Sequence, residues 1–278
     1  MDLITQLFPD EYIDALQMLD LRQIEEIRMS VGQPLCIRVG GRERQIYPRI
    51  GVGQLDAILQ TACGQSVYAH AETIRQGYVA LAGGHRLGIC GSGVVRDRVI
   101  QTIRAPTSLV LRIAHAVPGC AEKLLPHIKA STLLLGPPGS GKTTLLRDLV
   151  RLLSDQRGQR ISLADERGEL SGYSFGQHHL SVGFRTDVML QIPKDQAVMM
   201  MLRTMNPQWI ALDEITAPED IRAMETASYC GVNLLATAHG SSVQDLRSRP
   251  LYQRLMDLKL FSSLVLLRPD KSYELLEV

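Results

Sequence analysis

The stretch that decides the fold is "STLLLGPPGSGKTTLLRDLVRLL", residues 131–153. A short apolar run typical of a buried strand leads into a glycine-rich turn, and apolar residues at helical spacing follow. Gly136, Gly141, Lys142 and Thr143 fit the pattern G-x-x-x-x-G-K-[ST], whose backbone N–H groups curl around phosphates at a helix N-terminus. Because both flanking elements are present, a chance glycine-rich turn is the weaker interpretation. We expect phosphate contacts from Gly136, Pro137, Pro138, Gly139, Ser140, Gly141, Lys142, Thr143 and Thr144.

Bulk composition limits the class of protein. The chain has 278 residues, 45% hydrophobic residues and a formal net charge of +1, which suits one large or two modest globular domains. A signal-peptide pattern and a long apolar run are both absent from the sequence, so we expect no direct membrane span. The five cysteines (Cys36, Cys63, Cys90, Cys120 and Cys230) are scattered without a CxxC pair, which is typical of reduced core thiols in a cytosolic protein.

Two apolar runs end on an Asp-Glu pair, "SLADERG" at 162–168 and "IALDEIT" at 210–216. A phosphate-binding loop needs a second strand whose end holds a metal and the attacking water. The Thr143 hydroxyl is the expected Mg²⁺ ligand, Asp213 is expected to hold the metal indirectly, and Glu214 is the expected activator of water. The alternative for this pair is an ordinary acidic helix start ahead of Pro218.

A third apolar run, "NLLATAHGSS" at 233–242, ends on His239, which could sense a terminal phosphate. The adjacent His178 and His179 would face opposite sides of an extended chain, so we interpret them as surface or interface residues.

The sequence also bears on the choice of nucleotide. Guanine recognition usually needs Asn-Lys-x-Asp, and neither Asn206 nor Asn233 is followed by Lys. ATP is therefore favoured over GTP.

The pattern of predicted helices and strands changes near residues 115–125, where we place a domain boundary. Residues 1–30 predict helix, 34–48 a strand pair, 52–64 a helix, 77–95 strands turning at Gly83-Gly84 and at 91–93, and 108–114 a strand. Beyond this boundary, strands at 131–135, 161–165, 209–213 and 233–238 alternate with helices at 142–154, 195–205 and 218–229, and a hairpin ends the chain. This alternation predicts an α/β fold with a parallel sheet. We expect an α+β N-terminal domain over 1–118 and a nucleotide-binding domain over 119–278.

Several segments together resemble a known family. "GPPGSGKTT", "LADERGE", "LRTMNPQWIALDE" and "LLATAHG" follow the motif order of the type II and type IV secretion ATPases. Longer segments, among them "GHRLGICGSGVV" and "VGFRTDVMLQIPKDQAVMMMLRTMNPQWIALDEI", are similar to the family of stage III sporulation AA proteins. The resemblance spans nearly the whole chain.

This resemblance implies a RecA-like P-loop ATPase domain and a hexameric ring. Glu214, His239 and Arg203 match catalytic positions of the family, as Lys142 and Thr143 match its P-loop. Asp165 and Glu166 fall where the secretion ATPases have Glu and Asp, so their division of labour stays open. The family also sets arginines against phosphates, for which the candidates are Arg86, Arg104 and Arg112. The chain departs from the pattern at "DEITAPED", which lacks the Arg that usually follows Gly-Glu.

The resulting expectation is a cytoplasmic, Mg²⁺-dependent ATPase that is recruited to membrane-embedded channel or secretion proteins on the mother-cell side of a spore former. The alternative is a nucleic-acid-dependent RecA-like motor, which the N-terminal arginines keep open. Neutral net charge and 5% aromatic residues make nucleic acid the less favoured partner. A nucleotide-gated scaffold with negligible turnover is the third possibility.

Overall fold

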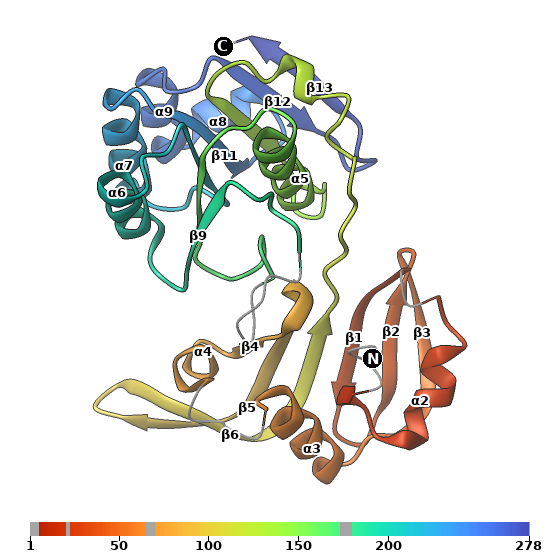
Figure 1. The fold of residues 1–278 in the computed structure, drawn as a ribbon. Helices are drawn as coiled ribbons and strands as arrows, with labels where there is room; N and C mark the ends of the chain where they lie inside the picture. Colours follow the sequence, from red (N-terminus) through yellow and green to blue (C-terminus); the bar gives the residue numbers. More distant parts are fainter. Residues whose placement is uncertain (1–5, 21–22, 65–69, 173–179, 278) are drawn as a thin grey trace. The chain divides into compact units, whose positions relative to one another are not determined.

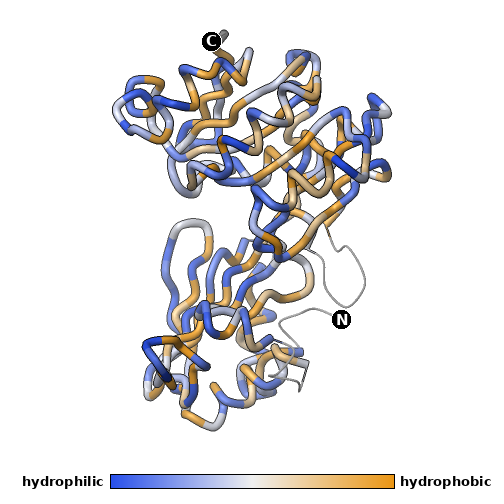
Figure 2. Tube along the Cα trace, turned by 90° about the vertical axis from the view of Figure 1, so that its left-hand side faces the viewer, coloured by the Kyte–Doolittle hydropathy of each residue, from blue (hydrophilic) through white to orange (hydrophobic). Residues whose placement is uncertain are grey.

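The computed structural model describes residues 6–20, 23–64, 70–172 and 180–277. These residues form two compact units (Figure 1). The N-terminal unit holds the described residues up to His115, and the C-terminal unit holds Ala116–Ser171 and the residues from Leu180 on. Figure 2 shows that hydrophobic and hydrophilic stretches alternate along the chain in both units. The division at 118/119 stays a prediction.

The N-terminal unit is built on an antiparallel sheet. Among the described residues its strand order is β3-β2-β1-β6-β5-β4. The strands are β1 (Ile24–Ser30), β2 (Pro34–Val39), β3 (Arg42–Arg49), β4 (Tyr78–Ala80), β5 (Arg86–Arg96) and β6 (Val99–Arg112). The accompanying helices are α2 (Asp10–Gln17), α3 (Val52–Ala62) and α4 (Ala71–Arg75). One buried cluster joins the sheet to α2 and α3.

The prediction of helix over residues 1–30 is wrong in its second half. Residues 24–30 form β1, which pairs with β2 and β6. Ile24 and Ile27 are both buried although they lie three residues apart, because the register shifts between Ile24 and Glu26. A bulge of this kind gives a strand the apolar spacing of a helix.

The predicted turn at 91–93 is also wrong. Strand β5 runs through these residues, and its hairpin with β6 turns at Asp97 and Arg98, whose φ values are 51° and 62°. Gly91 serves close approach instead, since a Cβ there would lie 2.7 Å from the carbonyl oxygen of Arg104. The turn at Gly83-Gly84 is confirmed, with φ values of 80° and 76°.

The C-terminal unit is an α/β layer structure, as predicted. Its described strands have the order β13-β12-β7-β11-β10-β8-β9, and all neighbours are parallel except β12 and β13. The strands are β7 (Thr132–Gly136), β8 (Ile161–Asp165), β9 (Thr186–Leu190), β10 (Trp209–Leu212), β11 (Asn233–His239), β12 (Ser263–Leu267) and β13 (Tyr273–Glu277). The helices are α5 (Lys142–Asp155), α6 (Lys194–Thr204), α7 (Pro218–Tyr229), α8 (Val243–Ser248) and α9 (Pro250–Asp257). Every strand and helix predicted for this half is present, whereas β9, α8 and α9 were not predicted.

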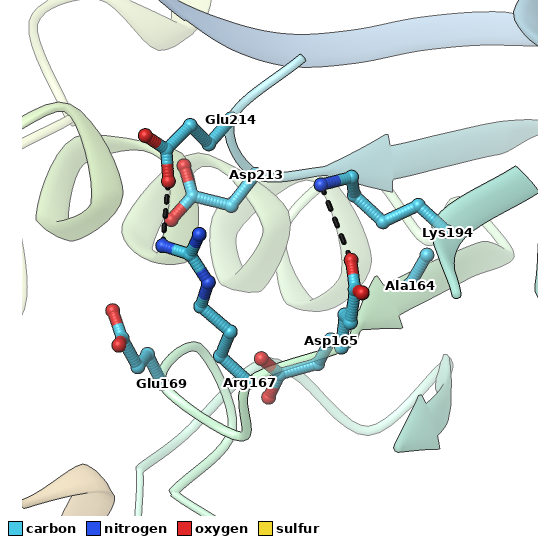
Figure 3. A pocket seen from close by; sticks show the side chains of 8 residues that line it. Ala164, Asp165, Arg167, Glu169, Lys194, Asp213 and Glu214 are labelled. Atoms are coloured by element: carbon cyan, nitrogen blue, oxygen red, sulfur yellow. Dashed lines mark hydrogen bonds and ion pairs between the residues drawn. The ribbon is translucent and has the colours of Figure 1, made fainter. Parts of the chain in front are cut away.

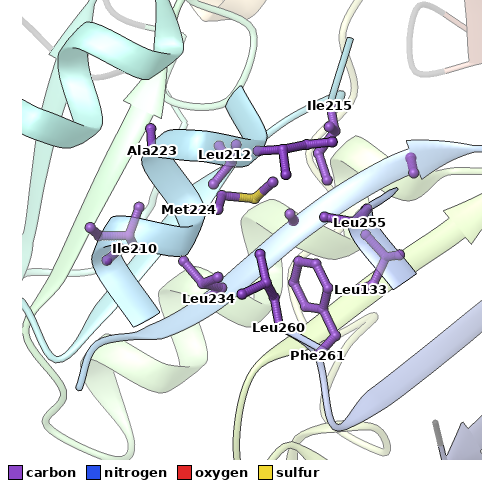
Figure 4. Close-up of a cluster of buried hydrophobic side chains, with 14 of the residues drawn as sticks. Leu133, Ile210, Leu212, Ile215, Ala223, Met224, Leu234, Leu255, Leu260 and Phe261 are labelled. Atoms are coloured by element: carbon purple, nitrogen blue, oxygen red, sulfur yellow. The ribbon is translucent and has the colours of Figure 1, made fainter. Parts of the chain in front are cut away.

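Alternate residues of the strands face two different helix layers. On β7, Leu133 and Leu135 pack in the cluster with α6, α7, α8 and α9 (Figure 4), whereas Leu134 packs in the cluster with α5. On β10, Leu212 packs in the first of these clusters and Trp209 in the cluster with α5. Both faces of the sheet are therefore buried, as parallel sheets require.

Strand β11 lies between β7 and β10, and the three run parallel. Their carboxyl ends therefore meet at one edge of the sheet, where the polar residues that follow them are brought together. The five cysteines are all free, as predicted, but their placement in the core is wrong for most of them: Cys63 is buried, Cys36 and Cys120 are half-buried, and Cys90 and Cys230 are exposed. In the part of the chain that the structure describes, none of the helices has the length and apolar character needed to cross a membrane.

The two-layer core predicts a large difference between two truncations. Leu133→Ala removes a fully buried side chain and is expected to lower the free energy of unfolding by about 2–5 kcal/mol. Met205→Ala, at a position 41% exposed, should cost about 0.5 kcal/mol or less. Urea denaturation followed by circular dichroism measures both, and equal losses would contradict the packing described.

Candidate active site

The glycine-rich loop joins β7 to α5. Gly139 and Gly141 have φ values of 75° and 92°, a left-handed conformation that glycine adopts at little cost. A Cβ placed on either would meet no heavy atom within 4 Å, so open space lies beside this backbone. The helix α5 starts directly after Gly141, with Lys142 as its first residue. The loop therefore presents backbone N–H groups and a helix N-terminus to that space.

The side chain of Lys142 contacts the glycine-rich loop itself. Its Nζ donates to the carbonyl oxygen of Pro137 at 2.9 Å and lies 3.1 Å from Nδ1 of His239. An ammonium group can only donate, so His239 accepts at Nδ1 and carries its proton on Nε2. Burial lowers the pKa of Lys142, and the carboxylates of Asp213 and Glu214 oppose that shift.

Asp213 connects the ends of three elements. Its Oδ2 accepts a hydrogen bond of 2.8 Å from Thr143 at the start of α5, and its Oδ1 accepts one of 2.5 Å from Thr237 on β11. The residue itself follows β10. These two bonds fix the orientation of the carboxylate beside the glycine-rich loop.

Glu214 holds a strained backbone. Its φ is 55°, in the left-handed region that a residue with a side chain seldom occupies. The Thr237 hydroxyl accepts the N–H of Glu214 at 2.8 Å, and the Thr237 carbonyl accepts that of Ile215 at 2.9 Å. The neighbouring strand therefore maintains the conformation that directs this carboxylate into the site.

Both carboxylate oxygens of Glu214 have a partner. Oε1 lies 2.9 Å from Nε2 of His239, and Oε2 lies 2.6 Å from Nη1 of Arg167 (Figure 3). A continuous chain of polar contacts therefore runs from Lys142 through His239 and Glu214 to Arg167. Burial opposes ionisation of Arg167, but the carboxylates of Glu214 and Glu169 outweigh it and raise the pKa of the guanidinium.

The second Asp-Glu pair is arranged differently. Asp165 is only 3% exposed, and its carboxylate accepts the N–H groups of Leu170 and Ser171 and the Ser171 hydroxyl, at 3.2, 2.9 and 2.8 Å. Its contacts hold the loop that follows β8. Glu166 instead lies 3.2 Å from Nζ of Lys194, and the dashed line to Lys194 in Figure 3 marks this pair.

Lys194 links two loops at the site. It is 7% exposed, and besides Glu166 its Nζ contacts Asp220 at 3.9 Å and the Thr216 hydroxyl at 3.5 Å. Asp220 in turn accepts the N–H groups of Thr216 and Ala217, both at 3.0 Å. The loop after β8 is thereby tied to the loop that follows Glu214.

A pocket opens among these groups. It is lined by Ala164, Asp165, Glu166, Arg167, Glu169, Lys194, Asp213 and Glu214, all from the C-terminal unit. The lining contains five carboxylates and two cations. Anionic phosphates near such a wall need additional positive charge, which Lys142 and a divalent cation would provide.

The structure does not bring every predicted residue to this pocket. Arg203 is exposed on the last turn of α6, ahead of β10 and therefore at the opposite edge of the sheet. Arg86 stacks on the Tyr78 ring at 3.8 Å, Arg112 lies 3.7 Å from Glu26, and Arg104 is exposed on β6, all in the N-terminal unit. His178 and His179 lie outside the described residues.

The residues present fit a Mg²⁺ ion with bound phosphate. Thr143 and Asp213 supply two oxygen ligands of the kind that Mg²⁺ prefers, while phosphate and water would complete its coordination. The hydroxyl of Ser140, inside the loop, is buried and has no hydrogen-bond partner among the described residues. Within the described ranges no three His, Cys, Asp or Glu side chains form a metal-binding group by themselves. Thr143 and Asp213 are the oxygen donors that this site would offer to a metal bound together with phosphate.

Sequence reasoning missed three residues of this site: Arg167, Lys194 and Thr237. Arg167 and Thr237 lie inside the motifs themselves, so their positions beside predicted site residues were an available signal. Lys194 starts a helix with no motif around it, and only its burial among carboxylates identifies it.

Comparison with solved structures defines the class of fold. The chain is similar to the ATPase DotB of Legionella pneumophila, with a TM-score of 0.61, 17% identity and coverage of 99% of this chain and 81% of that one. It is also similar to the pilus retraction motor PilT, with a TM-score of 0.62, 18% identity and coverage of 96% and 82%. The fold is therefore that of the RecA-like secretion and motor ATPases.

Comparison of sequences identifies the family. The family model for sporulation stage III, protein AA, matches residues 11–275. The chain is 35% identical to stage III sporulation protein AA of Bacillus subtilis over 274 residues, which cover 94% of this chain and 89% of that protein. A shorter match, 30% identity over 168 residues, covers 58% of this chain and 24% of the protein SEEDLING PLASTID DEVELOPMENT 1 of Arabidopsis thaliana. The chain belongs to the sporulation stage III protein AA family.

The role of Thr237 can be tested by stability. Thr237→Val keeps the shape of a side chain that is 1% exposed but removes the hydroxyl that donates to Oδ1 of Asp213 and accepts the N–H of Glu214. We expect a loss of about 1–3 kcal/mol in the free energy of unfolding. Thr204→Val is the control, because that exposed hydroxyl bonds only within its own helix, to the Met200 carbonyl. A Thr237→Val protein as stable as the control would show that the hydroxyl does not hold this edge together.

Proposed function

We propose that this chain is a Mg²⁺-dependent ATP hydrolase that works as a ring-shaped, hexameric motor. The observation that carries the proposal is the meeting of Lys142, Thr143, Asp213, Glu214 and His239 at one edge of the sheet. The fold that it shares with DotB and PilT supports a motor, and the PilT structure itself holds ADP.

The proposed reaction is attack of water on the terminal phosphorus of ATP. Glu214 accepts a proton from the water, a bond forms between the water oxygen and phosphorus, and the bond from phosphorus to the bridging oxygen breaks. ADP and inorganic phosphate are the products. His239 orients Glu214 through Nε2 and lies against Lys142 through Nδ1, so one side chain couples the base to the phosphate-binding lysine.

Each remaining residue has a defined task in this scheme. The loop 136–144 binds the phosphates with its N–H groups, and Lys142 leaves the Pro137 carbonyl to contact them. Thr143 and Asp213 would hold Mg²⁺, which when bound neutralises charge on the phosphate oxygens. Asp165 maintains the loop after β8, and Glu166 works through Lys194 to position the loop beyond Glu214.

Membership of the family supports a proposal for the biological setting. We infer that the motor powers a secretion-type channel between mother cell and forespore, from the cytoplasmic side of the membrane, through contact with membrane-embedded proteins. In such a ring, Arg203 or an arginine of the N-terminal unit would act on the nucleotide of a neighbouring copy.

Two substitutions test the hydrolase. Lys142→Ala removes the cation that binds phosphate and should lower the rate of phosphate release about 100-fold or more. Glu214→Gln should lower it about 10²–10⁴-fold, because the amide cannot take the proton. A coupled phosphate-release assay with Mg²⁺ and ATP measures both.

Exposed residues supply the matched controls, Lys123→Ala and Glu219→Gln, which should keep the parent rate. If Lys142→Ala or Glu214→Gln also kept the parent rate, the site would be assigned wrongly.

Light scattering of Glu214→Gln with Mg²⁺ and ATP tests the ring separately. A hexamer is expected, and a persistent monomer in the presence of its membrane partners would contradict the ring.

A further inference from the structure

Arg167 makes the shortest charged contact in the pocket. Its guanidinium lies 2.6 Å from Oε2 of Glu214, and it comes from the loop after β8, whereas Glu214 follows β10. Figure 3 shows the Arg167 side chain reaching across the pocket to Glu214, beside Asp213. The cation is thus held on the residue proposed to activate water.

The two cations of the pocket differ in exposure and in the number of their partners. The Lys194 side chain is 7% exposed and contacts Glu166, Asp220 and Thr216, so it is fixed among structural groups. The Arg167 side chain is 50% exposed, and among the described residues its ion pair is with Glu214. Because an exposed ion pair contributes little stability, a stronger anion can take Arg167 away from Glu214 at low cost.

The position of Arg167 also fits the polar chain through the site. Glu214 contacts His239 through one oxygen and Arg167 through the other, and His239 reaches Lys142. A terminal phosphate bound to Lys142 would stand beside Glu214, with the attacking water between them. Arg167 is then the pocket cation that already contacts the carboxylate beside which that phosphate would stand.

We propose that Arg167 is a sensor of the terminal phosphate, which pairs with Glu214 when no nucleotide is bound and moves to the terminal phosphate of ATP when it is. The inference rests on the proposed nucleotide site but goes beyond hydrolysis, because it assigns recognition of the triphosphate to a residue in the same chain. The planar guanidinium can bind two phosphate oxygens at once.

The exchange has two consequences. ADP has no terminal phosphate to attract Arg167, so the Arg167–Glu214 pair persists with ADP and the arginine adds affinity for ATP only. With ATP bound, Oε2 of Glu214 is released and is available to accept the proton of water. Oε2 of the proposed base is therefore free of Arg167 only when there is a phosphate to transfer.

The test compares binding of a triphosphate and a diphosphate. Affinities of the full-length protein for Mg²⁺ with a non-hydrolysable ATP analogue, and for Mg²⁺ with ADP, are measured by isothermal titration calorimetry. Arg167→Ala should weaken binding of the analogue at least tenfold more than that of ADP, and Arg167→Lys should restore part of the difference. Arg222→Ala is the control, since it breaks the exposed pair of Arg222 with Glu219 at 3.1 Å, outside the pocket, and should change neither affinity.

The outcomes separate this inference from the proposed function. Equal loss of both affinities, no loss of either, or a parent protein that binds both nucleotides alike would overturn the role of Arg167. If phosphate release depends on Lys142 and Glu214 while Arg167→Ala keeps the parent preference, the hydrolase stands and the sensor fails. If no phosphate is released but Arg167→Ala abolishes the preference for the triphosphate, the sensor stands and the hydrolase fails.

Discussion

The carboxylate of Asp213 is the interaction on which the site depends. Through Thr143 and Thr237 it connects the start of α5, the end of β10 and the end of β11. Thr237 also holds the N–H of Glu214, so the strained backbone of that residue is supported by the same hydroxyl that orients Asp213. One hydrogen-bonded group therefore aligns the glycine-rich loop, the expected metal ligand and the expected base.

The two Asp-Glu pairs look alike in sequence but serve different parts of the site. Asp213 and Glu214 face the glycine-rich loop, whereas Asp165 is buried among N–H groups of its own loop. Glu166 is joined to Lys194, whose other partners belong to the loop after β10. The second pair therefore acts as the support of the first, and Arg167, which follows it directly, is the residue that crosses to Glu214.

The strands and helices of the C-terminal half could be predicted from the sequence because the patterns that indicate them are local. A buried parallel strand is a continuous apolar run, and the glycine-rich loop fixes where β7 ends and α5 begins. The signals in the N-terminal half are weaker. A bulge gives β1 the apolar spacing of a helix, and Gly91, which predicts a turn, instead allows the close approach of two strands. Irregularities of this kind depend on the neighbouring strand, which the local pattern does not contain.

The same limit applies to the site. Lys142, Thr143, Asp213 and Glu214 carry motif positions, so their meeting could be predicted from parallel strands ending at one edge. The pairings of Arg167 with Glu214 and of Lys194 with Glu166 join residues 47 and 28 positions apart, and their geometry comes from the tertiary structure alone.

The central claim is that this edge of the sheet binds ATP and that Glu214 activates the water which cleaves it. The most direct measurement identifies the nucleotide that remains bound after incubation with Mg²⁺ and radiolabelled ATP, in the parent protein and in Glu214→Gln. The account predicts ADP on the parent and intact ATP on Glu214→Gln. Intact ATP on both proteins, or ADP on both, would contradict it.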